Sequence, residues 1–231
     1  GELAGWLENG VRRLGKPVPG ARKAAPIQGD GYAGLSFSAV ADANAAEKNP
    51  AADDGTMAIA ILGGKTVRTA AGLAVDSNMP AWLFDPNSKD ANAPELPMTQ
   101  RQVGAAATSF SLAKGESTTV TFVIAWHFPN YRPQTYHGDL NYGYVGRMYT
   151  NWFKDAPDVV RQLAKDLPRL EAETRTFRDA LYHETSLPYW FVQRVTAPVS
   201  TLAAATTQWW KNGRYYADEG VGFCAGTCTH V

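Results

Sequence analysis

The spacing of apolar residues changes near residue 155, and this change constrains the fold more than any other feature of the chain. Before it, short alternating or β-branched runs are separated by Gly and Pro, which is typical of strands joined by turns. After it, apolar residues recur every three or four positions, which is typical of amphipathic helices. We therefore predict a β domain over residues 1–154 and a helical region over residues 155–231.

Two segments carry the strongest strand patterns. Residues 56–62 (TMAIAIL) alternate large apolar side chains with alanines, so one face of the strand is bulky and the other is small. Residues 117–128 (STTVTFVIAWHF) are rich in β-branched residues and place Phe122, Ile124 and Trp126 on one face. Many short strands separated by turn signals favour an antiparallel β-sandwich.

The helical region begins with a capping signal. Asp155 is suited to cap a helix whose first turn contains Asp158, where the helix dipole favours a negative charge. The pattern predicts a helix to about residue 182, followed by a second helix that Ser186 caps and that runs towards residue 205. The apolar stripe of the first helix consists of Val159, Leu163, Leu167, Leu170, Phe177 and Leu181.

A hairpin is predicted near the end of the chain. Residues 207–210 and 214–216 flank Asn212-Gly213, a dipeptide that tolerates the positive φ angles of a type I′ turn. The hairpin leads directly into Asp218-Glu219-Gly220. The predicted order is therefore a β domain, then helices, then a hairpin that delivers a carboxylate.

Charge and composition exclude several classes of protein. The 22 basic and 22 acidic residues give a formal net charge of zero, which argues against a surface devoted to nucleic acid. No stretch approaches about 18 consecutive apolar residues, so no membrane span is expected. The chain opens on Gly1-Glu2-Leu3 and closes on Thr229-His230-Val231. We expect an internal segment of a longer protein, and its compartment is left open.

The terminal segment holds the candidate catalytic residues. Aromatic faces pack against the C–H faces of sugar rings, and Glu219 follows a hairpin that contains Trp209 and Trp210. Thr227 and His230 could line a polar pocket and bond to sugar hydroxyls. The alternative interpretation is that Glu219 is a solvated acid at a strand end, that the aromatics are core residues, and that the last residues form a polar turn.

Metal and thiol chemistry fit the same segment less well. Cys224, Cys228 and His230 would leave a tetrahedral zinc ion one ligand short, so we expect neither a metal nor another cofactor. Cys228 and His230 would stand about 6.5–7 Å apart in an extended segment, which is poor geometry for proton transfer. The other histidines are interpreted as structural: His127 at a strand end, His137 in a loop and His183 at a helix end.

Several motifs resemble glycoside hydrolase family 116, which includes the bile-acid β-glucosidases, the non-lysosomal glucosylceramidases. The motifs are GWLEN at residues 5–9, FVIAWHFPN at 122–130, YTNWF at 149–153, Leu187-Pro188, Glu219-Gly220 and GTCTHV at 226–231. They occur in the expected order over nearly the whole chain. The combination of Glu219-Gly220 with GTCTHV is the most specific of them.

The resemblance implies an N-terminal β-sandwich joined to an (α/α)6 barrel, of which this chain holds only the first helices and a hairpin. It implies that Glu219 is the nucleophile of a retaining β-glycosidase and that the acid/base Asp lies downstream of Val231. His230 falls where some relatives carry an Asp that contacts the sugar, and Thr227 and Trp210 are the other expected substrate contacts. The expected partner is a β-glucoside or a related sugar.

Two other functions remain as alternatives. A non-catalytic carbohydrate-binding or scaffold module would use aromatic residues of the sandwich, such as Trp82. A cysteine hydrolase would use Cys228. If the protein is a binding module, replacing Glu219 should leave its function unchanged. If it is a cysteine hydrolase, alkylation of Cys228 should abolish its activity.

Overall fold

The computed structural model describes residues 2–9, 19–42, 54–64, 66–73, 81–85, 95–131, 143–183, 185–197, 199 and 207–217. Its strands are β1 (Glu2–Asn9), β2 (Gly20–Gly29), β3 (Tyr32–Ala41), β4 (Gly55–Leu62), β5 (Val67–Leu73), β6 (Leu96–Pro97), β7 (Gln102–Ser109), β8 (Thr121–His127), β9 (Thr207–Trp209) and β10 (Tyr215–Ala217). Its helices are the 3₁₀ segments η1 (Ala81–Phe84) and η2 (Met148–Asn151) and the α-helices α2 (Ala156–His183) and α3 (Tyr189–Thr196).

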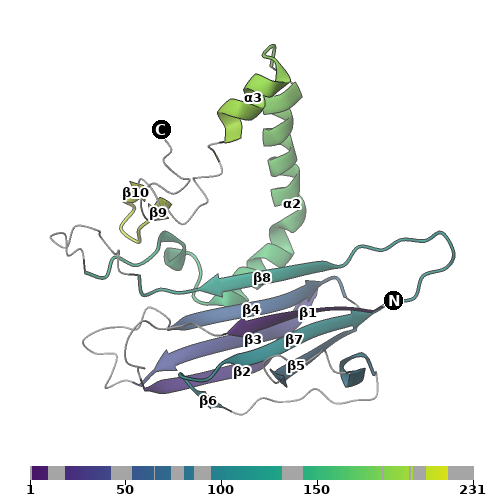
Figure 1. The fold of residues 1–231 in the computed structure, drawn as a ribbon, viewed down its shortest axis with the longest axis vertical. Helices are drawn as coiled ribbons and strands as arrows, with labels where there is room; N and C mark the ends of the chain where they lie inside the picture. The colour runs from purple at the N-terminus through teal and green to yellow at the C-terminus, as the bar shows by residue number, and fades with distance from the viewer. Residues whose placement is uncertain are drawn as a thin grey trace.

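Two antiparallel sheets form the body of the molecule (Figure 1). One has five strands in the order β6-β2-β3-β4-β8, and the other has three in the order β1-β7-β5. Leu35, Phe37, Ile59 and Ile61 from the larger sheet are buried in one cluster with Ala106 of the smaller one. This shared core agrees with the predicted sandwich and with the bulky face predicted for residues 56–62.

The small-residue faces of the sheets carry the outer layers. On the larger sheet, Ala58, Ala60 and Ala125 are buried beneath Ala156 and Val160 of α2. On the smaller sheet, an alanine-lined face is covered by η1. Side chains as small as Ala let a helix axis approach the sheet closely, so the alternation of large and small residues explains both layers.

Strand β8 begins later than predicted, and its alternation is present. Its ladder with β4 ends at the pair Leu62–Thr121, so residues 117–120 have no residue of β4 to pair with. The alternation is as predicted, but Ile124 and Trp126 are 55% and 58% exposed. The opposite face, which points at α2, is the buried one.

Helix α2 confirms its predicted start and end. Asp155 Oδ1 accepts the amide of Asp158 at 2.8 Å, which is the bond expected of an N-cap. A second cap comes from the sheet, because the Ala156 amide donates to Thr56 Oγ1 at 2.7 Å. The helix then continues through Pro168 to His183. Its start is therefore fixed both by its own sequence and by β4.

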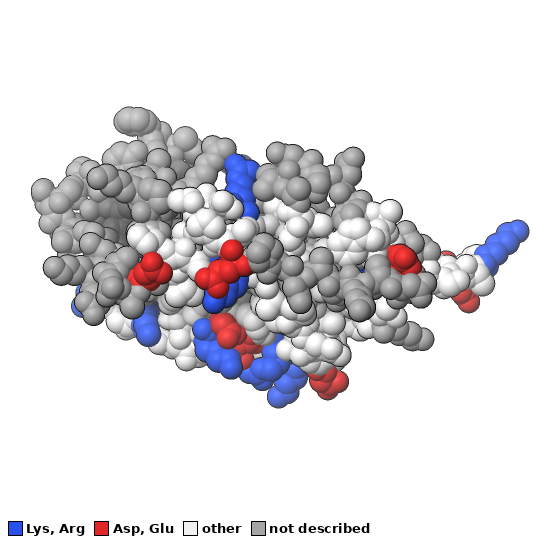
Figure 2. Space-filling model, turned by 90° about the horizontal axis from the view of Figure 1, so that it is seen from below, with Lys and Arg blue, Asp and Glu red and all other residues white. Residues whose placement is uncertain are grey.

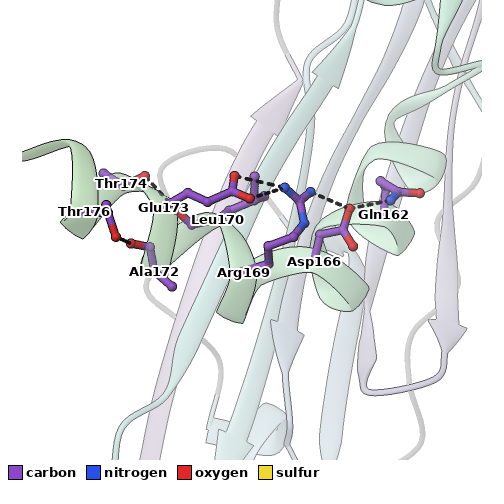
Figure 3. Close-up of polar contacts among 8 residues, drawn as sticks. All are labelled: Gln162, Asp166, Arg169, Leu170, Ala172, Glu173, Thr174 and Thr176. Atoms are coloured by element: carbon purple, nitrogen blue, oxygen red, sulfur yellow. Dashed lines mark hydrogen bonds and ion pairs between the residues drawn. The ribbon is translucent and has the colours of Figure 1, made fainter.

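Only the first turns of α2 lie on the sheet. Val159 and Leu163 pack into the buried cluster there, whereas Leu170 and Phe177 further along the predicted stripe are exposed. The distal part rises away from the sandwich (Figure 1). A side-chain network of Gln162, Asp166, Arg169 and Glu173 runs along one side of it (Figure 3).

The second helix is shorter than predicted and begins later. Its N-cap is Pro188 with an extended ψ of 140°, not Ser186, and it ends at Thr196. No side chain caps the first turn of this helix. Thr185 Oγ1 accepts the Leu187 amide at 3.1 Å, before the helix begins. The two helices meet through Tyr182, whose hydroxyl lies 3.1 Å from Thr196 Oγ1.

The α2 cap gives a pH-dependent stability. The hydrogen bond from Arg161 lowers the pKa of Asp158 below its ordinary value of 3.8. A lowered folded-state pKa contributes stability above the unfolded-state pKa, and this contribution is lost as the pH falls through the folded-state pKa. We expect Asp158→Asn to lower the free energy of unfolding by about 0.5 kcal/mol at pH 7. Urea titrations should show the difference shrinking below about pH 4; an equal difference at pH 7 and pH 2 would contradict it.

Candidate active site

The predicted site residues lie at the end of the chain, and the structure describes the path towards them. Trp210 is among the described residues, whereas Glu219, Thr227 and His230 lie outside them, as do Cys224 and Cys228. Strand β10 ends at Ala217, two residues before Glu219. The hairpin β9–β10 and the residues that contact it therefore form the described part of the candidate site.

The predicted hairpin is confirmed, with a different turn. Trp209 pairs with Tyr215, and the Trp210 amide donates to Arg214 O at 2.8 Å. The Gly213 amide donates to Trp210 O at 2.9 Å, and Gly213 has a φ of +86°. This is a three-residue loop with glycine at the left-handed position, rather than a two-residue type I′ turn.

The hairpin presents two of its aromatic residues and buries a third. Trp209 and Tyr215 are about half exposed, and the Trp209 ring meets Trp152 edge-on at a centroid distance of 5.4 Å. Trp210, the predicted sugar contact, is 4% exposed. Its backbone forms an antiparallel bridge with Arg147. Trp210 thus lies beside the turn of the hairpin, against the segment that follows the sandwich.

The segment after β8 is held at the strand end by partly buried contacts of His127 and Tyr149. His127 is buried, and its Nε2 lies 2.7 Å from Phe153 O, while its ring meets Tyr149 edge-on. The Tyr149 hydroxyl accepts the Phe128 amide at 2.9 Å and donates to Phe128 O at 3.2 Å. These contacts confirm His127 as a buried, hydrogen-bonded structural histidine. His183 ends α2 as expected, and His137 lies outside the described residues.

Removing one hydroxyl tests this junction. Tyr149→Phe keeps the ring beside His127 but leaves the Phe128 amide without its acceptor, so we expect a loss of about 1–2 kcal/mol in the free energy of unfolding. Urea denaturation of the variant measures the loss. Tyr144→Phe removes the same hydroxyl from an exposed tyrosine and should change stability by less than about 0.5 kcal/mol. Equal losses of unfolding free energy in the two variants would show that the Tyr149 hydroxyl does not stabilise this junction.

Several described acidic side chains lie beside basic ones. The carboxyl groups whose pKa values are lowered, Asp158 and Asp166, lie on α2, where they bond to Arg161 and to Gln162 with Arg169 respectively. Basic and acidic side chains lie next to one another on the face shown in Figure 2. Among the described residues, His, Cys, Asp and Glu form no group of three that could hold a metal ion. No helix in the described part is long and apolar enough to span a membrane.

Sequence reasoning missed the residues that dock the hairpin. Arg147 bonds to Gln208 and lies over Tyr131, and the Asn151 side chain bonds to Lys211 O. The available signal was a single cation within an aromatic run, YGYVGRMYTNWF, because Arg and aromatic faces attract one another. The described part of this run lies between the end of the sandwich and the hairpin.

The family comparison agrees with this layout. The family model described as "beta-glucosidase 2, glycosyl-hydrolase family 116 N-term" matches residues 4–170. This range covers both sheets and the first half of α2, and it ends before the hairpin. No curated protein matches the chain.

Proposed function

The chain belongs to glycoside hydrolase family 116, as its motifs predicted, and on this premise we propose that it is part of a retaining β-glycosidase whose nucleophile is Glu219. The observation that carries the proposal is the family match over both sheets and the start of α2. The hairpin adds support, because its second strand ends two residues before Glu219 and its first is docked on the segment that follows the sandwich. The proposed substrates are β-glucosides, including glucosylceramide-like ones.

The proposed chemistry has two steps. A Glu219 carboxylate oxygen forms a bond to C1 of the sugar while the bond from C1 to the leaving oxygen breaks, and that oxygen takes a proton from the acid/base Asp. Water then attacks C1, gives its proton to the same Asp, and releases Glu219 as a carboxylate. The nucleophile must stay ionised while its partner is protonated, so their pKa values must differ. In the proposal, Thr227 and His230 hold sugar hydroxyls, and Trp210 is the aromatic contact of the sugar.

The proposal places the acid/base Asp in an (α/α)6 barrel, and assigns residues 155–231 to a linker helix and the beginning of that barrel. Helix α3 carries exposed aromatic and aliphatic side chains, of which Trp190 is 68% exposed. Phe177 on α2 is 60% exposed. Apolar surface of this kind usually marks a contact with other parts of a protein, and further barrel helices would cover it. The domain boundary at residues 154 and 155 belongs to the same proposal.

The alternative binding module has less support. It relied on aromatic residues of the sandwich, such as Trp82. Trp82 is half-buried and packs against the cluster of Leu83, Ala105 and Ala107, so much of its ring serves the fold. The enzyme proposal needs no sandwich aromatic for its chemistry.

The 231-residue chain alone should be inactive. General acid–base catalysis contributes typically about 10²–10⁴-fold, and the proposed acid lies outside this chain. We therefore expect no hydrolysis of a nitrophenyl β-glucoside above the buffer rate, measured by release of nitrophenolate. The full-length enzyme at the same concentration is the positive control. Turnover by the isolated chain would contradict the proposal that the acid/base Asp lies outside this chain.

Covalent trapping tests the proposal directly. A 2-deoxy-2-fluoro-β-glucoside slows hydrolysis of the glycosyl–enzyme, so the sugar stays attached to the nucleophile. The full-length enzyme is treated with this probe, digested, and analysed by mass spectrometry. We expect the label on the peptide that contains Glu219. A label on any other peptide would overturn the assignment, and a label on Cys228 would favour the cysteine hydrolase.

A further inference from the structure

Arg147 lies between the sandwich and the hairpin. We propose that it is a positioning residue: it fixes the hairpin β9–β10 on the segment that leaves the sandwich, and so sets the direction in which the chain reaches Glu219. This inference rests on the proposed function for its catalytic consequence. The docking of the hairpin itself rests on the contacts of Arg147 with Gln208, Tyr131 and Trp210.

The guanidinium group joins two parts of the chain. Its Nη1 donates to Gln208 Oε1 at 3.1 Å, and its Cζ lies 4.1 Å from the centre of the Tyr131 ring. Gln208 belongs to β9, whereas Tyr131 follows the last strand of the sandwich. A planar cation can bond at its edge while its face lies on an aromatic ring, which an ammonium group does less well.

The backbone follows the same route. The amides of Val145 and Gly146 donate to Tyr131 O at 2.9 and 3.3 Å. Gly146 O in turn accepts the Lys211 amide at 3.3 Å, beside the bridge between Arg147 and Trp210. Hydrogen bonds therefore lead from the end of the sandwich to the turn of the hairpin, with Arg147 in the middle.

Two neighbouring contacts support the docked position. Asn151 Nδ2 donates to Lys211 O at 2.9 Å. The Trp152 and Trp209 rings meet edge-on. These contacts lie at the turn and on the exposed side of β9, whereas the Arg147 guanidinium acts further along β9 at Gln208. The Arg147 guanidinium therefore restrains β9 at Gln208, beyond these two contacts.

The restraint reaches the strand that leads to the nucleophile. Gln208 pairs with Tyr216 across the hairpin, and Tyr216 is three residues before Glu219. A change in the tilt of β9 is therefore transmitted to β10 through the ladder. Covalent catalysis needs the attacking atom within a few tenths of an ångström, since a misplacement of about 1 Å can cost 10²-fold in rate.

The experiment measures both the rate of labelling and the order of the hairpin in the full-length enzyme. The probe is 2,4-dinitrophenyl 2-deoxy-2-fluoro-β-glucoside. Glu219 bonds to C1 as dinitrophenolate departs, and this leaving group needs no proton, so labelling reports on the nucleophile rather than the acid. We expect Arg147→Met to slow labelling by about 10²-fold, to lower kcat and kcat/KM by the same factor, and to speed hydrogen exchange at the Trp210 and Lys211 amides.

Three further variants complete the comparison. Arg147→Lys keeps a cation over Tyr131 with a less suitable donor, so we expect it to restore part of the labelling rate. Gln208→Met removes the acceptor of the Arg147 bond and should act in the same direction as Arg147→Met. Arg214→Met is the matched control: its side chain is exposed on the same hairpin and bonds to no described residue, so labelling and exchange should match the wild type.

Each outcome separates the two claims. Wild-type labelling at a peptide without Glu219 would overturn the proposed function, and with it the catalytic part of this inference. Labelling of Arg147→Met at the wild-type rate would overturn the inference alone. Slower labelling with unchanged exchange at Trp210 and Lys211 would also overturn it, because the hairpin would not have moved. Should Arg147→Met fail to fold, Gln208→Met and Arg147→Lys give the same readouts.

Discussion

Glu219→Gln in the full-length enzyme is expected to lower kcat on a nitrophenyl β-glucoside by about 10⁴–10⁶-fold, the range found when the nucleophile or its partners are removed from another covalent hydrolase. The amide has the shape of the carboxylate, so the fold should be retained. It carries no negative charge, so it cannot form the glycosyl ester. Initial rates measure the loss, and circular dichroism checks the fold.

A control and a rescue make this result specific. Glu171→Gln makes the same change on the exposed surface of α2 and should keep the wild-type kcat. In Glu219→Ala, added azide can attack C1 from the side that the carboxylate occupied, while the aryl oxide leaves. The product should be the α-glycosyl azide. A β-glycosyl azide, or wild-type turnover by Glu219→Gln, would show that Glu219 is not the nucleophile.

Gly34→Ala should destabilise the sandwich by about 3 kcal/mol, the upper end of the usual cost of overpacking. A Cβ at Gly34 would lie 2.1 Å from Ile59 O and 2.6 Å from Ala60 Cα. Both are backbone atoms of β4, so no side-chain rotation relieves the contact. The strands β3 and β4 would have to separate inside the five-stranded sheet. Urea denaturation of the 231-residue chain measures the change.

Ser36→Ala provides the comparison for this prediction. Ser36 lies two residues further along β3, on the same face, and its hydroxyl donates to Ala25 O at 3.2 Å. Loss of this exposed hydrogen bond should cost less than about 1 kcal/mol. A Gly34→Ala variant as stable as Ser36→Ala would mean that β3 and β4 can move apart without cost.

The sandwich could be predicted because its pattern is local. Alternation in residues 56–62 placed Ile59 and Ile61 together, and both are buried between the sheets. The same alternation could not say that Ile124 and Trp126 are exposed. β8 is an edge strand, and the burial of its face depends on how far the opposite sheet extends, which is set by distant residues.

The helices and the hairpin show a similar division. Asp155 could be recognised as a cap because its partner is three residues away. The Asn212-Gly213 pair correctly located the hairpin, but a three-residue loop also satisfies the positive φ of Gly213, so the turn type was mispredicted. The apolar stripe of α2 was located correctly, but its distal residues Leu170 and Phe177 are exposed in the described part of the chain.

The candidate site was only partly predictable. Glu219, Thr227, His230 and Trp210 were selected by residue chemistry and by motif, and Glu219, Thr227 and His230 remain predictions. Arg147 was missed because its partner Gln208 is 61 residues away. A single sequence carries no sign of which aromatic residue a cation will meet. Contacts of this range are set by the packing of whole elements.

The bond between the Ala156 amide and Thr56 Oγ1 has a consequence for biosynthesis. The two residues are 100 positions apart, and β4 leaves the ribosome first. At about 5–20 residues per second, translation reaches Ala156 about 5–20 s later, long after a β-hairpin can close. We therefore expect the nascent helix to meet the Thr56 hydroxyl and the small residues of β4 after β4 has paired with β3. Its first turn is templated by protein that was made earlier.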